Sequence, residues 1–478
     1  MKNKDIFSNF IWRFAERIGA QMVAFVVSIV LARLLEPSAY GTVALLTVFT
    51  VILQVFVDSG LGNALIQKKD ADNIDFSTVF FTNIVFCTVL YTLLFVVSPF
   101  IASFYNDNAI TAYLRVLGIT VFVSGIKNVQ QAYVSRNMLF KRFFYSTLGG
   151  TIAAGIVGVM LAYSGFGVWA LVAQQVVNLV IDTAILWLTV KWRPDFTFSF
   201  TRLKSLFSYG WKLLASRLID TVYSNVTQLL VGKIYSSADL AQYNRGNQFP
   251  NLIITNVNTS IDSVLLPAMS KDQESRERVK NMTRRSIKVS TYIMAPLMMG
   301  LVFCGESIVG LILTDKWLPS VFFMRIFCIT YMFYPIHTAN LNAIKAVGRS
   351  DLFLKLEIEK KLIGIIALIC TVFISVKAMT YSLLFTSIAS QIINSFPNKK
   401  LLGYGYKEQL KDILPSIALA VFMGVAISPV NYLISSYFVR LLIQIPAGII
   451  IYIVGSKKLR IDSFEYILTI LKTYIKRK

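Results

Sequence analysis

The sequence predicts an all-α membrane protein with 14 transmembrane helices, which form two pseudo-symmetric six-helix lobes and a C-terminal helix pair. Three observations support this fold class: recurring apolar runs, an alternation of basic charge between the segments that join them, and a weak internal repeat. Of the 478 residues, 55% are hydrophobic and 15% are charged, whereas a soluble domain carries about 25% charged residues. A soluble enzyme of this composition would expose large apolar patches that drive association, so that class of protein is nearly excluded.

Apolar runs long enough to cross a bilayer, about 20 residues for a helix, recur along the whole chain. The alternating pattern of a transmembrane barrel is absent, so helices are expected. Arg13, Glu16 and Arg17 interrupt the first run and no small-residue cleavage site follows it, so we expect no cleaved signal peptide. The expected spans are 10–34, 41–64, 77–102, 113–134, 146–163, 168–190, 207–233, 247–268, 288–312, 322–346, 359–376, 380–396, 412–434 and 437–455.

The segments between the expected spans alternate sharply in their content of basic residues. The set of alternate segments that includes the N-terminus and residues 456–478 holds 30 Lys and Arg residues. The opposite set holds three, namely Arg245, Lys316 and Lys377. Because cytoplasmic loops retain basic residues, both termini are expected in the cytoplasm. The net charge of +22 then reflects membrane topology, and nucleic acid is not expected as a partner.

A weak internal repeat appears when the chain is shifted by 200 residues. Arg17 then aligns with Arg217, and Arg33 aligns with Lys233. Six helices separate the two copies, so the copies share one orientation, as parallel transporter repeats do. A substrate path is expected between the two copies. The expected parts are an N-terminal six-helix lobe, 1–200, a C-terminal six-helix lobe, 201–396, and a region with two additional transmembrane helices and a basic cytoplasmic tail, 397–478.

Five cations lie deep inside the expected spans and not near the span ends, where a long side chain can reach water. A charge at the bilayer centre costs ~2.5–3.5 kcal/mol, so such residues usually face a bundle interior or a wet cavity. We expect a basic cavity between the lobes that binds an anionic headgroup, because the planar Arg side chain pairs bidentately with phosphate oxygens. The five expected binding residues are Arg13, Arg17, Lys127, Lys212 and Arg217.

The alternative is that intramembrane carboxylates neutralise these cations in place. Glu16 adjoins Arg17 in the first span. Asp220 lies three residues after Arg217 in the seventh span. Deep cations and deep carboxylates are equal in number, so the sequence leaves both interpretations open. If transport is coupled to an ion, the expected coupling residues are Glu16, Asp58 and Asp220.

Motifs of catalytic sites are missing from the sequence, which contains no Walker A, GxSxG or HExxH pattern. We therefore expect neither an enzyme nor a primary ATPase. The single His and four scattered Cys residues argue against a metal or other cofactor site. His337 is expected to be a hydrogen-bonded interior residue, with a proton relay as the less favoured interpretation.

A family resemblance that extends over nearly the whole chain is carried by seven short stretches. They are WRFAER at 12–17, LLEPSAYG at 34–41, VDSGLGNAL at 57–65, YNR at 243–245, DKWLP at 315–319, YPIH at 334–337 and GRSDLFLK at 348–355. In these stretches the chain resembles the bacterial polysaccharide (O-antigen and exopolysaccharide) flippases of the MOP exporter superfamily, in the branch that includes the colanic acid exporter.

This resemblance implies a multi-pass protein of the bacterial cytoplasmic (inner) membrane. Its implied function is to move a polyprenyl-pyrophosphate-linked oligosaccharide repeat unit from the inner to the outer leaflet by alternating access. The implied partners are this lipid-linked glycan and membrane lipids, together with a glycan polymerase and glycosyltransferases. A cation-coupled multidrug antiporter and a lipid II flippase of the same superfamily stay open as alternatives. A membrane-embedded glycan polymerase is disfavoured, since no large loop is present for its chemistry.

Overall fold

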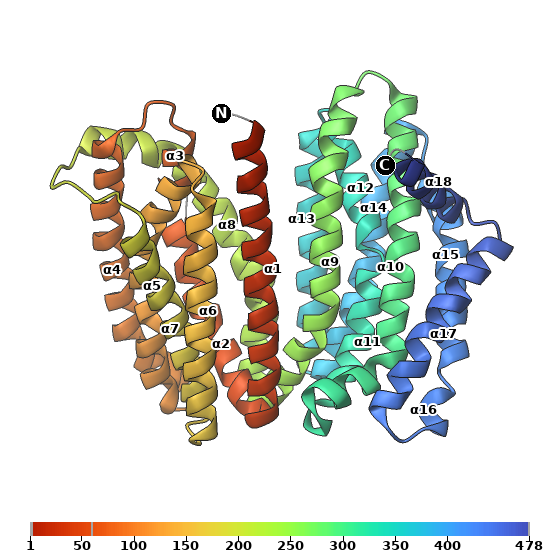
Figure 1. Cartoon of the computed structure of the whole chain (residues 1–478), viewed down its shortest axis with the longest axis horizontal. Helices are drawn as coiled ribbons and strands as arrows, with labels where there is room; N and C mark the ends of the chain where they lie inside the picture. The colour runs from red at the N-terminus through yellow and green to blue at the C-terminus, as the bar shows by residue number, and fades with distance from the viewer. Residues whose placement is uncertain (1–2, 59–60, 477–478) are drawn as a thin grey trace. The chain divides into compact units, whose positions relative to one another are not determined.

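The computed structural model describes the backbone of residues 3–58 and 61–476, and the described chain is helical without strands. It folds into two compact units, residues 1–241 and 242–478 (Figure 1). Within these ranges the structure describes the backbone but not the side chains of residues 3–11, 13, 14, 17, 58, 63, 205, 208–210, 212, 213, 471 and 474–476.

The first unit consists of helices joined by short connections. In Figure 1, α4, α5, α6 and α7 run side by side, and α1 packs along α6. The turn before α4 is set by a capping box, in which Asp72 and Asp75 each accept a hydrogen bond from the other residue's backbone N–H. The helices are α1 Asn3–Leu34, α2 Pro37–Asp58, α3 Leu61–Gln67, α4 Asn73–Tyr105, α5 Ala109–Arg136, α6 Phe140–Tyr163, α7 Val168–Thr189 and α8 Phe200–Ile234.

The second unit is built around α10, which packs against α11, α12, α15 and α17. Helix α9 begins in the first unit and continues into the second. The helices are α9 Ser237–Lys271, α10 Arg276–Leu313, a 3-10 turn Asp315–Trp317, α11 Ser320–Tyr331, α12 Tyr334–Ala346, α13 Ser350–Thr371, α14 Val376–Leu402, α15 Tyr406–Ile427, α16 Val430–Leu433, α17 Tyr437–Lys458 and α18 Asp462–Lys476.

Eleven of the expected spans coincide with a single helix, and three are divided: 41–64 between α2 and α3, 322–346 between α11 and α12, and 412–434 between α15 and α16. In the described chain, ten helical segments are long and apolar enough to cross a membrane. Outer faces of these segments carry exposed apolar side chains, such as Val85, Leu93 and Phe100 on α4, as a protein surrounded by lipid requires. The total of 14 transmembrane helices and the cytoplasmic location of both termini stay predictions.

Helix α8 belongs to the first compact unit, although the expected C-terminal lobe begins at residue 201. The reason is the packing of its two ends. Leu206 near its start lies in the buried core formed by α3, α4, α5, α6 and α7. Near its end, the Tyr105 hydroxyl of α4 donates to the Leu229 carbonyl, with 3.3 Å between the oxygens. The division into six-helix lobes therefore stays a prediction based on the repeat.

The start of α2 lies very close to the start of α9. A Cβ atom built on Gly41 would lie 1.6 Å from the Ser237 carbonyl oxygen, so only glycine fits at this position. The neighbouring Thr42 hydroxyl donates to the Ser237 hydroxyl, with 3.5 Å between the oxygens. This contact joins a helix of the expected N-terminal lobe to a helix of the expected C-terminal lobe, inside the first compact unit.

Candidate functional site

Helix α1 is held against α6 by a polar and an aromatic contact. The buried Glu16 carboxylate accepts a hydrogen bond from the Thr147 hydroxyl, with 3.3 Å between the oxygens. One turn earlier, the ring of Trp12 meets the ring of Phe144 edge-on at a centroid distance of 5.3 Å. This helix also contains Arg13 and Arg17, two of the expected anion-binding residues. The structure does not describe their side chains.

Lys127 on α5 forms an ion pair with Asp182 on α7, at 2.5 Å between Nζ and Oδ2. Both side chains are largely buried, with exposed fractions of 13% for Lys127 and 8% for Asp182. The second oxygen of Asp182 is buried and has no hydrogen-bond partner in the described part of the chain. Lys127 is thus neutralised within the first unit in this structure, as the salt-bridge interpretation expects, and its contact with a substrate stays a prediction.

Arg217 and Asp220 lie on α8, and both are exposed. Arg217 forms no ion pair with any residue that the structure describes. An exposed guanidinium on α8 can bind an anion if that face of the helix meets water. The expected site also includes Lys212 on the same helix and Asp58 at the end of α2. The structure does not describe the side chains of these two residues.

The intramembrane His and Asp of the second unit are bound by amides. Asn342 donates to Asp262 at 2.7 Å. The His337 Nδ1 atom lies 3.0 Å from the Asn394 amide nitrogen, and its ring packs edge-on against Tyr334. His337 is therefore a hydrogen-bonded interior residue.

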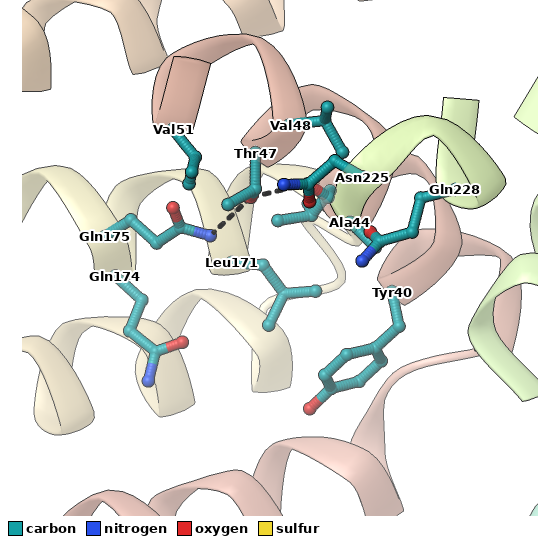
Figure 2. Close-up of a pocket in the computed structure, with 11 residues that line it drawn as sticks. Tyr40, Ala44, Thr47, Val48, Val51, Leu171, Gln174, Gln175, Asn225 and Gln228 are labelled. Atoms are coloured by element: carbon teal, nitrogen blue, oxygen red, sulfur yellow. Dashed lines mark hydrogen bonds between the residues drawn. The ribbon is translucent and has the colours of Figure 1, made fainter. Parts of the chain in front are cut away.

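A pocket of about 360 Å³ with a mixed polar and apolar lining lies between α2, α7 and α8 of the first unit. Figure 2 shows the side chains that surround it, including the hydrogen bond from the Gln175 amide to the Thr47 hydroxyl at 3.5 Å. As far as the structure describes it, the lining contains amides, hydroxyls and apolar groups, and no charged residue. The lining residues are Tyr40, Val43, Ala44, Thr47, Val48, Val51, Leu171, Gln174, Gln175, Asn225 and Gln228.

The residues of this pocket were not among the expected site residues, which are all charged groups inside the spans. The sequence nevertheless contains a pattern that indicates this pocket. Gln174 and Gln175 stand next to each other inside an apolar span, and Asn225 and Gln228 lie three residues apart in another. Amides at membrane depth need hydrogen-bond partners, so adjacent amides in an apolar span indicate a polar surface.

Comparison with known proteins gives one family and several relatives. The model of a family described as "Polysaccharide biosynthesis protein" matches residues 30–322. The teichuronic acid biosynthesis protein TuaB of Bacillus subtilis (strain 168) is 26% identical and covers 84% of this chain and 85% of its own. The lipopolysaccharide biosynthesis protein WzxC of Escherichia coli (strain K12) is 20% identical over 83% of each chain.

Among solved structures, the inward closed conformation of the lipid II flippase MurJ aligns with a TM-score of 0.74 at 14% identity. The alignment covers 95% of this chain and 99% of MurJ. An inward-facing multidrug resistance transporter of the MATE family, from the MOP superfamily, aligns with a TM-score of 0.63 at 14% identity. That alignment covers 82% of this chain and 98% of the transporter. These similarities show a shared fold.

Proposed function

Because the chain belongs to the polysaccharide biosynthesis protein family, we propose that it moves a polyprenyl-pyrophosphate-linked oligosaccharide repeat unit across the bacterial cytoplasmic membrane. The lipid-linked glycan enters from the inner leaflet and leaves in the outer leaflet. The family match over residues 30–322 is the observation that carries this proposal. Relatives named for teichuronic acid and lipopolysaccharide biosynthesis, together with a fold shared with a lipid II flippase, support it.

A polar face on α9 supports a watery path for a glycan. Asn251, Thr255, Thr259 and Ser263 follow each other at four-residue intervals and are all exposed, so they share one face of the helix. Hydrocarbon offers no hydrogen bonds to such groups. The hydroxyls of this face also donate within α9, Thr259 to the Thr255 carbonyl and Ser263 to the Ser260 carbonyl. In this proposal the face, with the exposed Asn251 amide, is directed towards water or a polar substrate.

In this proposal the pyrophosphate binds to Arg13, Arg17, Lys212 and Arg217, while the polyprenyl chain stays in lipid. Lys127 joins them only if its pair with Asp182 opens. Alternating access requires two conformations of similar free energy that the substrate binds differently. Glu16, Asp58 and Asp220 are the proposed coupling residues if an ion drives the cycle. A polymerase and glycosyltransferases are the proposed partners, since they consume and produce such a lipid-linked glycan.

The test is transbilayer movement of a fluorescent polyprenyl-pyrophosphate-linked disaccharide in vesicles, measured with a quencher that cannot cross the membrane. Arg217→Ala should reduce the rate by about 10- to 100-fold, because a hydrogen bond to a charged group contributes about 1.5–3 kcal/mol. Arg217→Lys should retain part of the rate, since it keeps the charge but loses the planar fork.

Lys204→Ala is the matched control, since Lys204 is an exposed cation near the start of the same helix, and it should move the lipid at the wild-type rate. A wild-type rate in Arg217→Ala would remove Arg217 from the proposed site. Transport of cationic dyes without movement of the lipid-linked disaccharide would instead indicate a multidrug antiporter. Movement of lipid II in preference to the disaccharide would indicate a lipid II flippase.

A further inference from the structure

The pocket between α2, α7 and α8 has the chemistry of a site for a neutral, hydroxyl-rich ligand. Its volume of about 360 Å³ lies within the range of small-molecule sites, about 300–1,000 Å³. Thr47, Gln174, Gln175, Asn225 and Gln228 supply both donors and acceptors to it. Because the lining residues that the structure describes include no charged group, they offer no counter-charge to a phosphate or to a cationic drug.

Two of its amides have unused hydrogen-bonding capacity. Gln174 and Gln228 form no hydrogen bond with any residue that the structure describes. Each amide can donate twice and accept through its oxygen, and leaving such a group without a partner in an apolar environment costs free energy. A sugar with adjacent hydroxyls can donate to the amide oxygen and accept from the amide nitrogen at the same time.

The remaining lining suits the carbon face of a sugar ring. Val43, Val48, Val51 and Leu171 form apolar walls, and the ring of Tyr40 lies at one side of the pocket (Figure 2). A pyranose has C–H groups on its faces and hydroxyls around its edge. A pocket with apolar walls and amides that converge on it from two helices matches both parts.

The pocket is connected along α8 to the proposed pyrophosphate site. Arg217, Thr221, Ser224 and Gln228 are spaced three or four residues apart, so they follow one face of the helix. The rise of 1.5 Å per residue separates the Cα atoms of Arg217 and Gln228 by ~16 Å. An anion at Arg217 and a neutral group in the pocket can therefore belong to one elongated ligand.

We propose that this pocket is a carbohydrate subsite, which binds hydroxyls of the glycan while the pyrophosphate lies at Arg217. This inference rests on the proposed function and adds a separate site for the sugars. It lies near the starts of α2 and α7 and near the end of α8, which is the outer half of the membrane in the predicted topology. The subsite gives the protein a means to distinguish a glycan-bearing lipid from a bare one.

The test compares two probes on purified protein in nanodiscs, a polyprenyl-pyrophosphate-linked repeat unit extracted from producing cells and polyprenyl pyrophosphate without sugar. The double variant Gln174→Leu/Gln228→Leu removes both unused amides. It should bind the glycan-bearing lipid about tenfold more weakly, because two neutral hydrogen bonds are lost. Its affinity for the bare lipid should stay unchanged, and Arg217→Ala should weaken the binding of both probes.

Gln67→Leu serves as the matched control, because Gln67 is an exposed glutamine at the end of α3, outside the pocket lining. It should bind both probes as the wild-type protein does. Equal weakening for both probes, or no weakening for either, in a double variant with wild-type Tm would overturn the carbohydrate subsite. If the wild-type protein binds neither probe, the proposed function fails as well, so the two failures are distinguishable.

Discussion

At the scale of single residues, the pair Lys127–Asp182 shows why an intramembrane charge needs its partner identified before it receives a role. The two residues are 55 positions apart in the sequence and meet at 2.5 Å between α5 and α7. Sequence spacing reveals neighbours on one helix but not a partner on another helix. The depth of Lys127 in its span is therefore compatible with both a substrate contact and a structural ion pair.

Removing one partner of this pair should destabilise the protein strongly. Lys127→Ala leaves the buried Asp182 carboxylate without its cation, which costs about 3–5 kcal/mol for a buried pair. The double variant Lys127→Met/Asp182→Leu removes both charges and should recover most of the lost Tm, measured by thermal unfolding in detergent. A double variant that is as unstable as Lys127→Ala would show that the ion pair does not account for the loss.

At the scale of elements, the first turn of α4 is tied to the first turn of α8. The Asp72 carboxylate caps α4 and accepts a hydrogen bond from the Arg202 guanidinium. That hydrogen bond, together with one from the Asp75 backbone N–H, lowers the pKa of Asp72 to about 2. A carboxyl whose pKa is lowered on folding stabilises the folded state at pH values above its unfolded pKa.

Asp72→Asn should therefore reduce stability in a pH-dependent way. Asparagine keeps an oxygen acceptor for the α4 cap but loses the charge that Arg202 binds. The Tm should fall slightly at neutral pH, because this pair is partly exposed and screened by water. The difference from wild type should shrink as the pH falls from about 4 towards 2, measured by thermal scans over that range. A difference that does not change with pH would indicate a lost cap and not a lost charge.

The helices themselves were largely predictable, because long apolar runs mark them directly. The division of three expected spans was not predicted, among them that of 322–346 into α11 and α12. Pro335 lies at the start of α12, where it lacks the N–H that would continue the hydrogen-bond ladder. For the candidate site, the exposure of Arg217 agrees with an anion contact. The neutral pocket was missed, because its amides come from two helices, α7 and α8, and only the folded chain brings them together.

At the scale of the whole molecule, we propose that the transport cycle separates the start of α2 from the start of α9, because these helices belong to the two expected lobes. In this structure Thr42 and Ser237 are in hydrogen-bonding contact at 3.5 Å. Cysteines at both positions, in a Cys370→Ser background that removes the exposed native thiol, should form a disulfide under mild oxidation. The cross-link should stop lipid movement in vesicles, and a reductant should restore it.

Each single cysteine variant in the same background is the control, and neither should respond to oxidant. The native Cys87, Cys304 and Cys328 are buried, so they should not interfere. If the cross-linked protein moves lipid at the wild-type rate, then separation of these two helix starts is not part of the cycle.

The tight approach at Gly41 also has a consequence for how this gene can vary. Even a methyl group there would overlap the Ser237 carbonyl, whereas nothing lies within 4 Å of a Cβ placed on Gly300. In a saturation library selected for activity, codon 41 should tolerate no replacement, while codon 300 should accept alanine. Two glycines of the same chain are thus under very different selective constraints, and the difference comes from the backbone of one residue, Ser237.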